Sequence, residues 1–262
     1  MKKWFALFLM PLFGLSLSSC GTSIGTYPDA DKYLIGDQTY DENISSLDID
    51  WISGNLTLIE DESIEGVKVE EKTDLSDEKE RVHSYLNNGQ LNIKFFASGY
   101  RKTSFTGFTK DLTVTYHPGI ANLDIDLTSG NLKADSLTAD KIDIEMTSGS
   151  SNVGRISANE VDVDFTSGNL GIEHLSANTF DAEMTSGTIK VVFDEISKAS
   201  FDLTSGSIDM TLPDAGGKVK VAKTSGSVNA VRPCSIENNL YTFGDGDADI
   251  KVEMTSGIVT IR

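Results

Sequence analysis

The sequence predicts an all-β protein, a right-handed parallel β-helix (solenoid) with about 19 residues per coil and an irregular N-terminal cap. The tripeptide Thr-Ser-Gly occurs seven times in the 262 residues, and its first five copies are spaced 19 residues apart. A constant period of this length indicates one small structural unit stacked on itself. Apolar residues alternate with polar ones before each copy, and no stretch has a helical period, so the unit consists of strands.

The first strand of each unit precedes the tripeptide. Residues 123–127, 142–146, 161–165 and 180–184 all alternate an apolar residue with a polar one, and every polar position is Asp or Glu. Apolar residues with a period of two give a strand with one buried and one solvated face. Stacked strands would therefore align the carboxylates in columns on the outside, which we expect to gather a diffuse atmosphere of cations.

A second strand follows each tripeptide, because apolar residues alternate again after the glycine, as at Leu132 and Ala134. Glycine tolerates positive φ, and Thr and Ser hydroxyls can satisfy backbone groups at a sharp bend, so the tripeptide is predicted to form a corner. Parallel crossovers are overwhelmingly right-handed, which sets the predicted hand of the coil. The predicted corner glycines are Gly54, Gly130, Gly149, Gly168, Gly187, Gly206, Gly226 and Gly257.

The predicted solenoid domain covers residues 34–262. Residues 34–122 form its irregular N-terminal part, 123–230 its regular coils, 231–249 an inserted loop and 250–262 a final coil. A degenerate corner at Ser53 precedes Ser129 by 76 residues, which is four times 19. Because no clean corner lies between them, the sequence leaves open whether this spacing is accidental.

The N-terminus is predicted to be a lipoprotein signal peptide, residues 1–19. Lys2 and Lys3 precede an apolar run over 4–17 that is short for a membrane span, and residues 17–20 read Leu-Ser-Ser-Cys, as in a bacterial lipobox. Cys20 is therefore the predicted lipidation site and residues 20–33 a lipidated tether. The alternative is an uncleaved anchor that ends in this tetrapeptide by chance.

The charge of the chain disfavours one class of partner. Its net charge is −18, and removal of the two lysines with the signal peptide lowers it to −20. Such an acidic chain is a poor candidate for nucleic-acid binding. Cys234 is the only cysteine after Cys20, so we expect no intramolecular disulfide once Cys20 is lipidated.

One segment departs from the acidic composition. Residues 81–110 contain five Lys and Arg, no Asp or Glu, and several aromatic residues. This mixture could stack on sugars or meet an anionic partner, or it could form two ordinary strands with a basic loop. The candidate ligand-binding residues are Arg81, Lys94, Tyr100, Arg101, Lys102, Phe105, Phe108 and Lys110.

The sequence offers no catalytic, cofactor or metal motif. The carboxylates recur with the coil instead of forming one asymmetric pair, and His83, His117 and His174 are far apart without metal-ligand spacing. The alternating aspartates of 245–249 lack the glycine and glutamate positions of an EF-hand loop, so we expect a turn there. We therefore expect a protein that is not an enzyme and that has no cofactor.

The lipobox, the segment Asp-Trp-Ile-Ser-Gly-Asn at 50–55 and the Thr-Ser-Gly repeats resemble the bacterial DUF4097 family of adhesin-labelled β-solenoid proteins. The resemblance implies a right-handed β-helix in the cell envelope with a role in adhesion, and it supplies no active-site residues. The expected function is a non-catalytic adhesion or scaffolding module, held by its N-terminal lipid on the extracytoplasmic face of the cell membrane or outer membrane. Its partner would be a surface ligand or an envelope protein. The alternatives are a regulatory subunit of a membrane partner and, less favoured, a polysaccharide-active enzyme.

Overall fold

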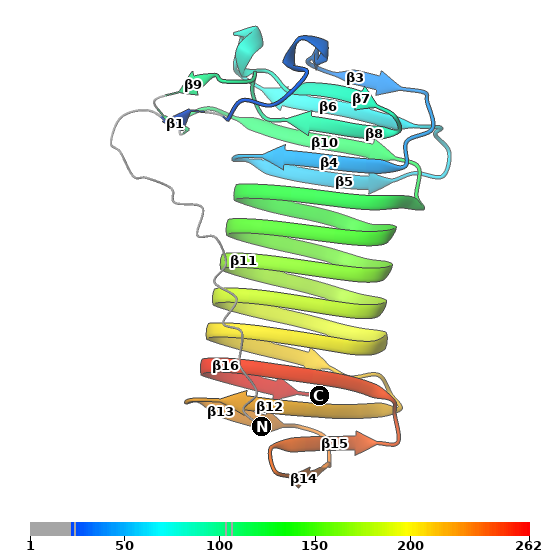
Figure 1. The fold of residues 1–262 in the computed structure, drawn as a ribbon, viewed down its shortest axis with the longest axis vertical. Coiled ribbons are helices and arrows are strands. Elements are labelled where there is room, and N and C mark those ends of the chain that lie inside the picture. The colour runs from blue at the N-terminus through cyan, green and yellow to red at the C-terminus, as the bar shows by residue number, and fades with distance from the viewer. Residues whose placement is uncertain (1–21, 24, 103, 106) are drawn as a thin grey trace, which may run out of the picture.

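The structure is a computed structural model that describes residues 22–23, 25–102, 104–105 and 107–262. These residues form sixteen strands and two short 3₁₀ helices, so the all-β prediction is confirmed. The molecule is a rod, with an irregular cap at the N-terminal end, stacked coils in the middle and a hairpin at the far end (Figure 1). No helix in the described part is long and apolar enough to cross a membrane.

The middle of the rod is one continuously coiling element, β11 (Ile120–Thr211). Successive coils place equivalent residues on top of each other, as the glycines show. A Cβ added to Gly149 would lie 1.9 Å from the carbonyl oxygen of Gly130, and one added to Gly168 would lie 2.3 Å from that of Gly149. Residues 19 positions apart are therefore direct neighbours here.

The corner glycines have a conformation that few other residues adopt. All eight predicted positions have positive φ, from 97° at Gly54 to 152° at Gly206. A side chain at these corners would be strained by its backbone and would also collide with the carbonyl of the adjacent coil. The tripeptide recurs because every coil meets both constraints at the same place.

The core is a narrow column of apolar side chains inside the coils. Ile125, Ile144 and Val163 occupy equivalent positions on neighbouring coils and are at most 2% exposed. Alternation along each strand thus divides the residues between the interior and the solvent, as the period of two predicts.

The first coil comes from residues that lie far earlier in the chain. β4 (Ser46–Trp51) pairs in parallel with β11, with Leu47 opposite Leu123, and β5 (Asn55–Glu60) continues the same coil with Leu56 opposite Leu132. These partners differ by 76 positions, so the spacing between Ser53 and Ser129 reflects direct stacking. The residues between them leave the stack to form the cap.

The cap combines parallel and antiparallel pairing. β8 (Gln90–Lys94) and β10 (Lys110–Tyr116) pair in parallel with β4 and β5 as one more coil. Antiparallel partners cover this coil, namely β6 (Val67–Thr73) on β10, β7 (His83–Asn87) on β8, β3 (Gln38–Tyr40) on β6 and β2 (Leu34–Ile35) on β7. The sheet is therefore mixed, which corrects the prediction of a purely parallel fold.

At the other end, the order of the coils differs from the order of the chain. β16 (Ala248–Ile261) pairs in parallel with the last coil of β11, with Val252 opposite Phe201. On its other side it pairs with β12 (Gly216–Lys223) and β13 (Ser227–Ala230). β16 thus lies in the stack between two coils that precede it in the chain. The coil formed by β12 and β13 was predicted to lie between β11 and β16, but it lies beyond β16 instead.

Residues 231–249, predicted to be an inserted loop, contain a hairpin. β14 (Ser235–Glu237) and β15 (Leu240–Gly244) pair antiparallel, and β15 also pairs antiparallel with β12. This hairpin covers part of the open end of the rod (Figure 1). The loop prediction missed it because its strands are short, three and five residues, and lie outside the 19-residue repeat.

The segment predicted to be a tether packs on the cap from residue 25 onward. Tyr27 donates its hydroxyl to the carbonyl of Phe96 at 3.1 Å, and its backbone N–H donates to Ser98 Oγ at 3.0 Å. β1 (Thr22–Ser23) pairs with β9 (Arg101–Lys102), and η1 (Ala30–Lys32) follows. Cys20 and the predicted signal peptide lie outside the described residues.

Candidate functional site

A long groove follows the stacked coils on one side of the rod. Its volume is about 1090 Å³. The acidic residues that lie two positions before each corner threonine, together with these threonines, line the groove along the coils. Gly25, Thr26, Tyr27 and Phe105 line it at the cap end. The repeated residues that line it are Asp50, Asp126, Glu145, Asp164, Glu183, Asp202, Thr128, Thr147, Thr166, Thr185 and Thr204.

The coil itself positions these side chains. Asp50 lies opposite Asp126 in the pairing of β4 with β11, so the column passes from the cap into the regular coils without a break. Neighbouring strands are about 4.8 Å apart, which is therefore the spacing of the carboxylates and of the hydroxyls along the groove. The result is a regular array of negative charges beside a regular array of hydroxyl groups.

Two carboxylates of this array, Asp126 and Asp164, have raised pKa values. Burial and the adjacent Asp50 carboxylate raise the pKa of Asp126 to about 8, with smaller effects of Glu145 and Asp124. Burial and the Glu183 carboxylate raise the pKa of Asp164 to about 6. A carboxylate held among like charges gains stability from a cation or a hydrogen-bond donor, so the groove suits ligands that supply either.

The predicted basic surface is largely neutralised by carboxylates from elsewhere in the chain. Lys94 Nζ lies 2.8 Å from Asp48 Oδ1 and 2.5 Å from Asp50 Oδ2, in parallel-paired strands. In the same way Arg81 pairs with Glu71, and Lys102 pairs with Glu80 of η2 (Glu78–Glu80). Tyr100 donates its hydroxyl to Glu80 at 2.8 Å. These partners lie outside residues 81–110, so the local composition could not reveal them.

Lys110 lies in the interior, not on a surface. Its side chain is 0% exposed and pairs with Glu71, whose side chain is also 0% exposed. Its Nζ donates to the carbonyl of Glu80 at 2.7 Å and lies 4.8 to 5.1 Å from the ring centres of Phe95, Phe96 and Trp51. Burial lowers the pKa of Lys110 to about 8, although Glu71 acts in the opposite direction. A ligand outside the protein cannot reach this amine.

The remaining predicted residues separate into two places. Lys94 and Phe105 line the groove, whereas Phe108 contacts Phe96 and the Lys102 amine in the cap. The side chain of Arg101 is exposed. The backbone of Arg101 belongs to β9, which pairs with β1. The sequence prediction missed the role of Tyr27, which closes the cap end of the groove from the segment expected to be a tether. The carboxylate and threonine columns, in contrast, were visible in the repeat but were interpreted as a solvated face.

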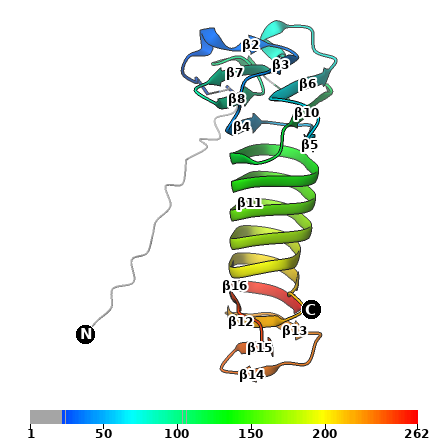
Figure 2. The same ribbon diagram turned by 90° about the vertical axis from the view of Figure 1, so that its right-hand side faces the viewer.

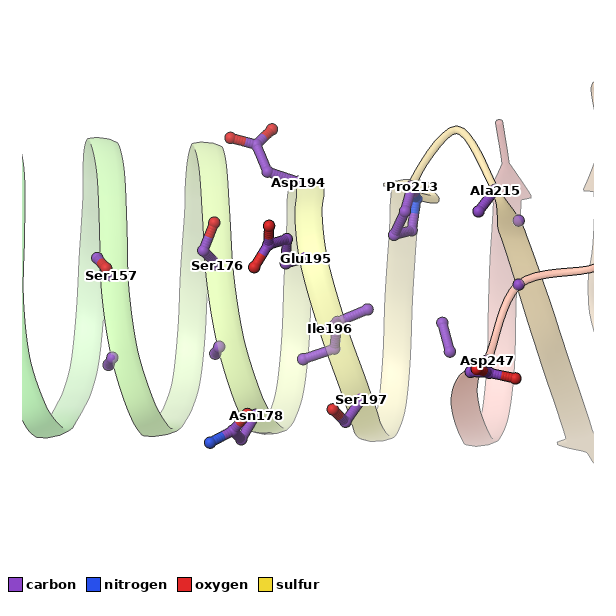
Figure 3. A pocket seen from close by; sticks show the side chains of 15 residues that line it. Ser157, Ser176, Asn178, Asp194, Glu195, Ile196, Ser197, Pro213, Ala215 and Asp247 are labelled. Carbon is purple, nitrogen blue, oxygen red and sulfur yellow. The ribbon is translucent and has the colours of Figure 1, made fainter.

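A second, smaller hollow lies on the opposite edge of the coils, with a volume of about 490 Å³. Figure 3 shows Ser157 and Ser176 on successive coils, with Asp194 and Glu195 beside them and Asp247 across from them. Asp194 pairs with Arg155 and His174, both at 3.0 Å, which lowers the pKa of its carboxyl. Among the described residues, no group of three or more His, Cys, Asp or Glu is arranged to hold a metal ion.

The mixed sheet, the stacked corners and the groove define an all-β repeat protein with an extended acidic groove. The model of the Toastrack DUF4097 family matches residues 44–257, which is most of the chain. The protein belongs to this family. No curated protein matches it.

Several solved structures are similar over most of their length. A "putative adhesin" from Parabacteroides merdae is 13% identical, with 88% of this chain and 96% of that chain covered and a TM-score of 0.45. One from Bacteroides fragilis is also 13% identical, with 87% and 97% covered and a TM-score of 0.44. A "putative lipid binding protein" from Parabacteroides distasonis is 13% identical, with 87% and 97% covered and a TM-score of 0.36. None of these likenesses is strong enough to transfer a ligand between proteins.

Proposed function

We propose that the protein is a non-catalytic binding module of the bacterial envelope that acts in adhesion or scaffolding. The observation that carries the proposal is the groove, which repeats one carboxylate and one hydroxyl at each of several coils. An enzyme needs a single asymmetric constellation of reacting groups, whereas an array of equal sites suits the holding of an extended ligand. The groove is the proposed ligand surface, and Lys94 and Phe105 are the predicted binding residues of the basic-aromatic segment that contribute to it.

The module is anchored by a lipid on Cys20, on the extracytoplasmic face of the cell membrane or outer membrane. Support comes from the charged start, the apolar run and the lipobox. Replacement of Cys20 with Ala should abolish metabolic labelling by fatty acid and release the protein from the membrane fraction, because one acylated residue is the anchor. Undiminished labelling of the variant would refute the anchor.

The coil is right-handed with about 19 residues per turn. Support comes from the stacked glycines, which are 19 positions apart through most of β11, and from the strong preference of parallel crossovers for this hand. An experimental structure that showed a left-handed coil would contradict it.

Adhesion through the groove is tested with two matched double variants. Asp164→Asn with Glu183→Gln removes two charges that line the groove, and Asp162→Asn with Asp181→Asn removes two from the neighbouring column of the same strands. Cells lacking the gene and complemented with each variant would be compared for attachment to immobilised host matrix and to other bacterial cells. We expect the groove variant to lose most attachment and the control to retain it.

The outcomes separate the candidate functions. Equal attachment by cells with the wild-type protein and cells without it would contradict adhesion and favour the alternative of a regulatory subunit. Loss of attachment by both variants to the same extent would show that general negative charge, rather than the groove, mediates binding.

A further inference from the structure

The N-terminal segment is attached to the cap before the first strands of the cap begin. The carbonyl of Gly25 accepts a hydrogen bond from the N–H of Gly99 at 3.2 Å, and the Tyr27 hydroxyl donates to the carbonyl of Phe96 at 3.1 Å. The ring of Tyr27 also contacts that of Tyr33, with 4.6 Å between the ring centres. The chain is therefore fixed to the cap at Gly25.

This attachment limits where a lipid on Cys20 can be. Cys20 precedes Gly25 by five residues in the sequence. A fully extended chain spans at most about 3.6 Å per residue, so the lipidated residue cannot be more than about 18 Å from Gly25.

The rod is longer than this reach. From Leu47 of β4 to Val219 of β12 there are seven strand-to-strand steps, namely one to β11, four between its coils, one to β16 and one to β12. At about 4.8 Å for each step, these strands are roughly 34 Å apart. A lipid on Cys20 therefore belongs to the cap end of the rod and cannot reach the C-terminal hairpin.

The flank of the rod is unsuited to lie on an anionic lipid surface. β11 contains sixteen Asp and Glu and five Lys and Arg, a net charge of −11. Its outward columns of carboxylates extend over successive coils. Like charges repel within about a Debye length, roughly 8 Å at physiological salt, so an anionic bilayer disfavours a rod that lies on its side.

The end of the cap, in contrast, exposes two large apolar side chains. Leu34 and Ile35 of β2 are 49% and 44% exposed. Figure 2 shows β2 at this end of the rod and β14 at the opposite end. Lys32 and Tyr33 directly precede the apolar pair. Aliphatic side chains beside Tyr and Lys are typical of surfaces at the boundary between lipid headgroups and acyl chains.

Carboxylates also flank β2, but they are few. Asp29 pairs with Lys32 at 3.0 Å, and Asp37 accepts the N–H of Glu71 at 2.9 Å. Asp31 is exposed and forms no ion pair with the described residues. Contact through the cap end brings these few carboxylates to the lipid, whereas a rod on its side would bring the columns of β11.

We propose that the cap end of the rod, with Leu34 and Ile35, rests on the bilayer that holds the lipid of Cys20, and that the C-terminal hairpin points away from the membrane. The inference rests on the lipid anchor of the proposed function. The acyl chain and the apolar pair supply the two membrane contacts that stable attachment requires. The groove then begins beside the membrane, at Tyr27, and extends outward along the coils.

The orientation is tested by fluorescence quenching with the full lipidated chain. The vesicles contain phosphatidylcholine, one-fifth phosphatidylglycerol and a lipid with a nitroxide on its headgroup. All variants carry Cys234→Ser, so that only the introduced thiol is labelled. Ala30→Cys places a fluorophore at the cap end, Glu173→Cys on a middle coil and Ser235→Cys on the C-terminal hairpin, all at exposed positions. We expect quenching at Ala30→Cys to be at least fivefold stronger than at the other two.

Flotation of the chain with the vesicles is measured first. Failure to float would refute the anchor and the orientation with it. In a chain that floats, equal quenching at the three positions would show that the rod lies on its side, and strongest quenching at Ser235→Cys would show the opposite orientation. Absence of quenching at Ala30→Cys would show that the cap is held away from the bilayer. Each of these three results would overturn the proposal and leave the anchor intact.

The contact surface is tested with two matched double variants, each combined with the label at Ala30→Cys. Leu34→Ser with Ile35→Ser removes the apolar pair of the cap end. Val231→Ser with Ile236→Ser removes two side chains of the opposite end, which are 52% and 61% exposed. We expect the first variant to lower quenching at least twofold, while its lipid still makes it float, and the second to leave quenching unchanged. Equal quenching in the two variants would overturn the contact through Leu34 and Ile35.

Discussion

The regular coils and the cap solve the same problem, a stable stack of strands, with different interactions. In β11 each coil repeats the residues of its neighbour, so backbone pairing and equivalent apolar positions hold the stack. In the cap the pairing changes direction, and contacts between unique residues hold it together. A buried pair, Lys110 with Glu71, lies against Trp51 and Phe95, with no equivalent in the coils.

The difference teaches where a substitution does most damage. A repeated residue in the coils shares its role with equivalent residues on other coils. The corners are the exception, because each corner glycine lies against a backbone carbonyl of the adjacent coil. A residue of the cap network has no substitute. The largest effects should therefore come from the cap pair, the next from a corner, and small effects from the outward columns.

The strongest test of the comparison is Glu71→Gln. It leaves the Lys110 cation buried without its carboxylate, which should lower the free energy of unfolding by about 3 to 5 kcal/mol. Chemical denaturation measures the effect. Glu70→Gln is the control, since Glu70 pairs with Lys68 at 2.9 Å on the surface and should cost at most about 1 kcal/mol. Equal effects at the two positions would show that the buried pair does not hold the cap.

A corner is tested with Gly168→Val. Gly168 has φ 144°, and a Cβ there would lie 2.3 Å from the carbonyl oxygen of Gly149, so strain and collision should together cost about 3 kcal/mol. Gly171→Ala in the same coil is the control, because an added Cβ there meets the Asn152 side chain at 3.2 Å and the carbonyl oxygen of Ser151 at 3.8 Å, an ordinary contact distance. Asn169→Ser, a residue already present at Ser150 one coil earlier, should also be mild. Melting temperatures that do not separate Gly168→Val from these two would contradict the corner geometry.

A stabilising change should come from Ser151. This residue takes the core position held by Leu132 and Leu170 on the neighbouring coils, is 0% exposed, and its hydroxyl has no hydrogen-bond partner among the described residues. Ser151→Ala removes this unpaired group and should raise the free energy of unfolding by about 1 kcal/mol. Ser150→Ala, at a partly exposed position, should change it by less than about 0.5 kcal/mol. A loss of stability in Ser151→Ala would mean that the hydroxyl has a partner in solution, such as a bound water.

The smallest effect should be a dependence on pH in the acidic column. The pKa of Asp126 is raised to about 8, so the folded protein binds this proton more tightly than the unfolded chain does. Stability should therefore decrease as the pH rises from about 4, the pKa of an Asp in the unfolded chain, through 8, by about 1 kcal/mol after allowance for solvent screening of this half-exposed pair. Asp126→Asn should flatten the dependence, as should 0.5 M NaCl. An equally steep profile in the variant would exclude Asp126 as its source.

Particular residues show how far the sequence could be interpreted. The corner glycines and the alternation at 123–127 required only local information, because positive φ and a period of two are properties of the backbone at each residue. Lys110 looked the same as Arg101 in the sequence, yet one is buried and the other exposed. Burial of a charge depends on a partner, and Glu71 is 39 residues away.

The sequence by itself determined the repeating unit, its strands and its corners, since each coil buries its apolar residues against equivalent positions of its neighbours and needs no distant partner. Only the tertiary structure decided how the ends are built. It placed β16 between two earlier coils, brought Tyr27 to the end of the groove and paired the basic residues of the cap with distant carboxylates. The physical reason is that strand pairing at an end depends on which free edge offers the better fit, and order along the chain does not specify that choice.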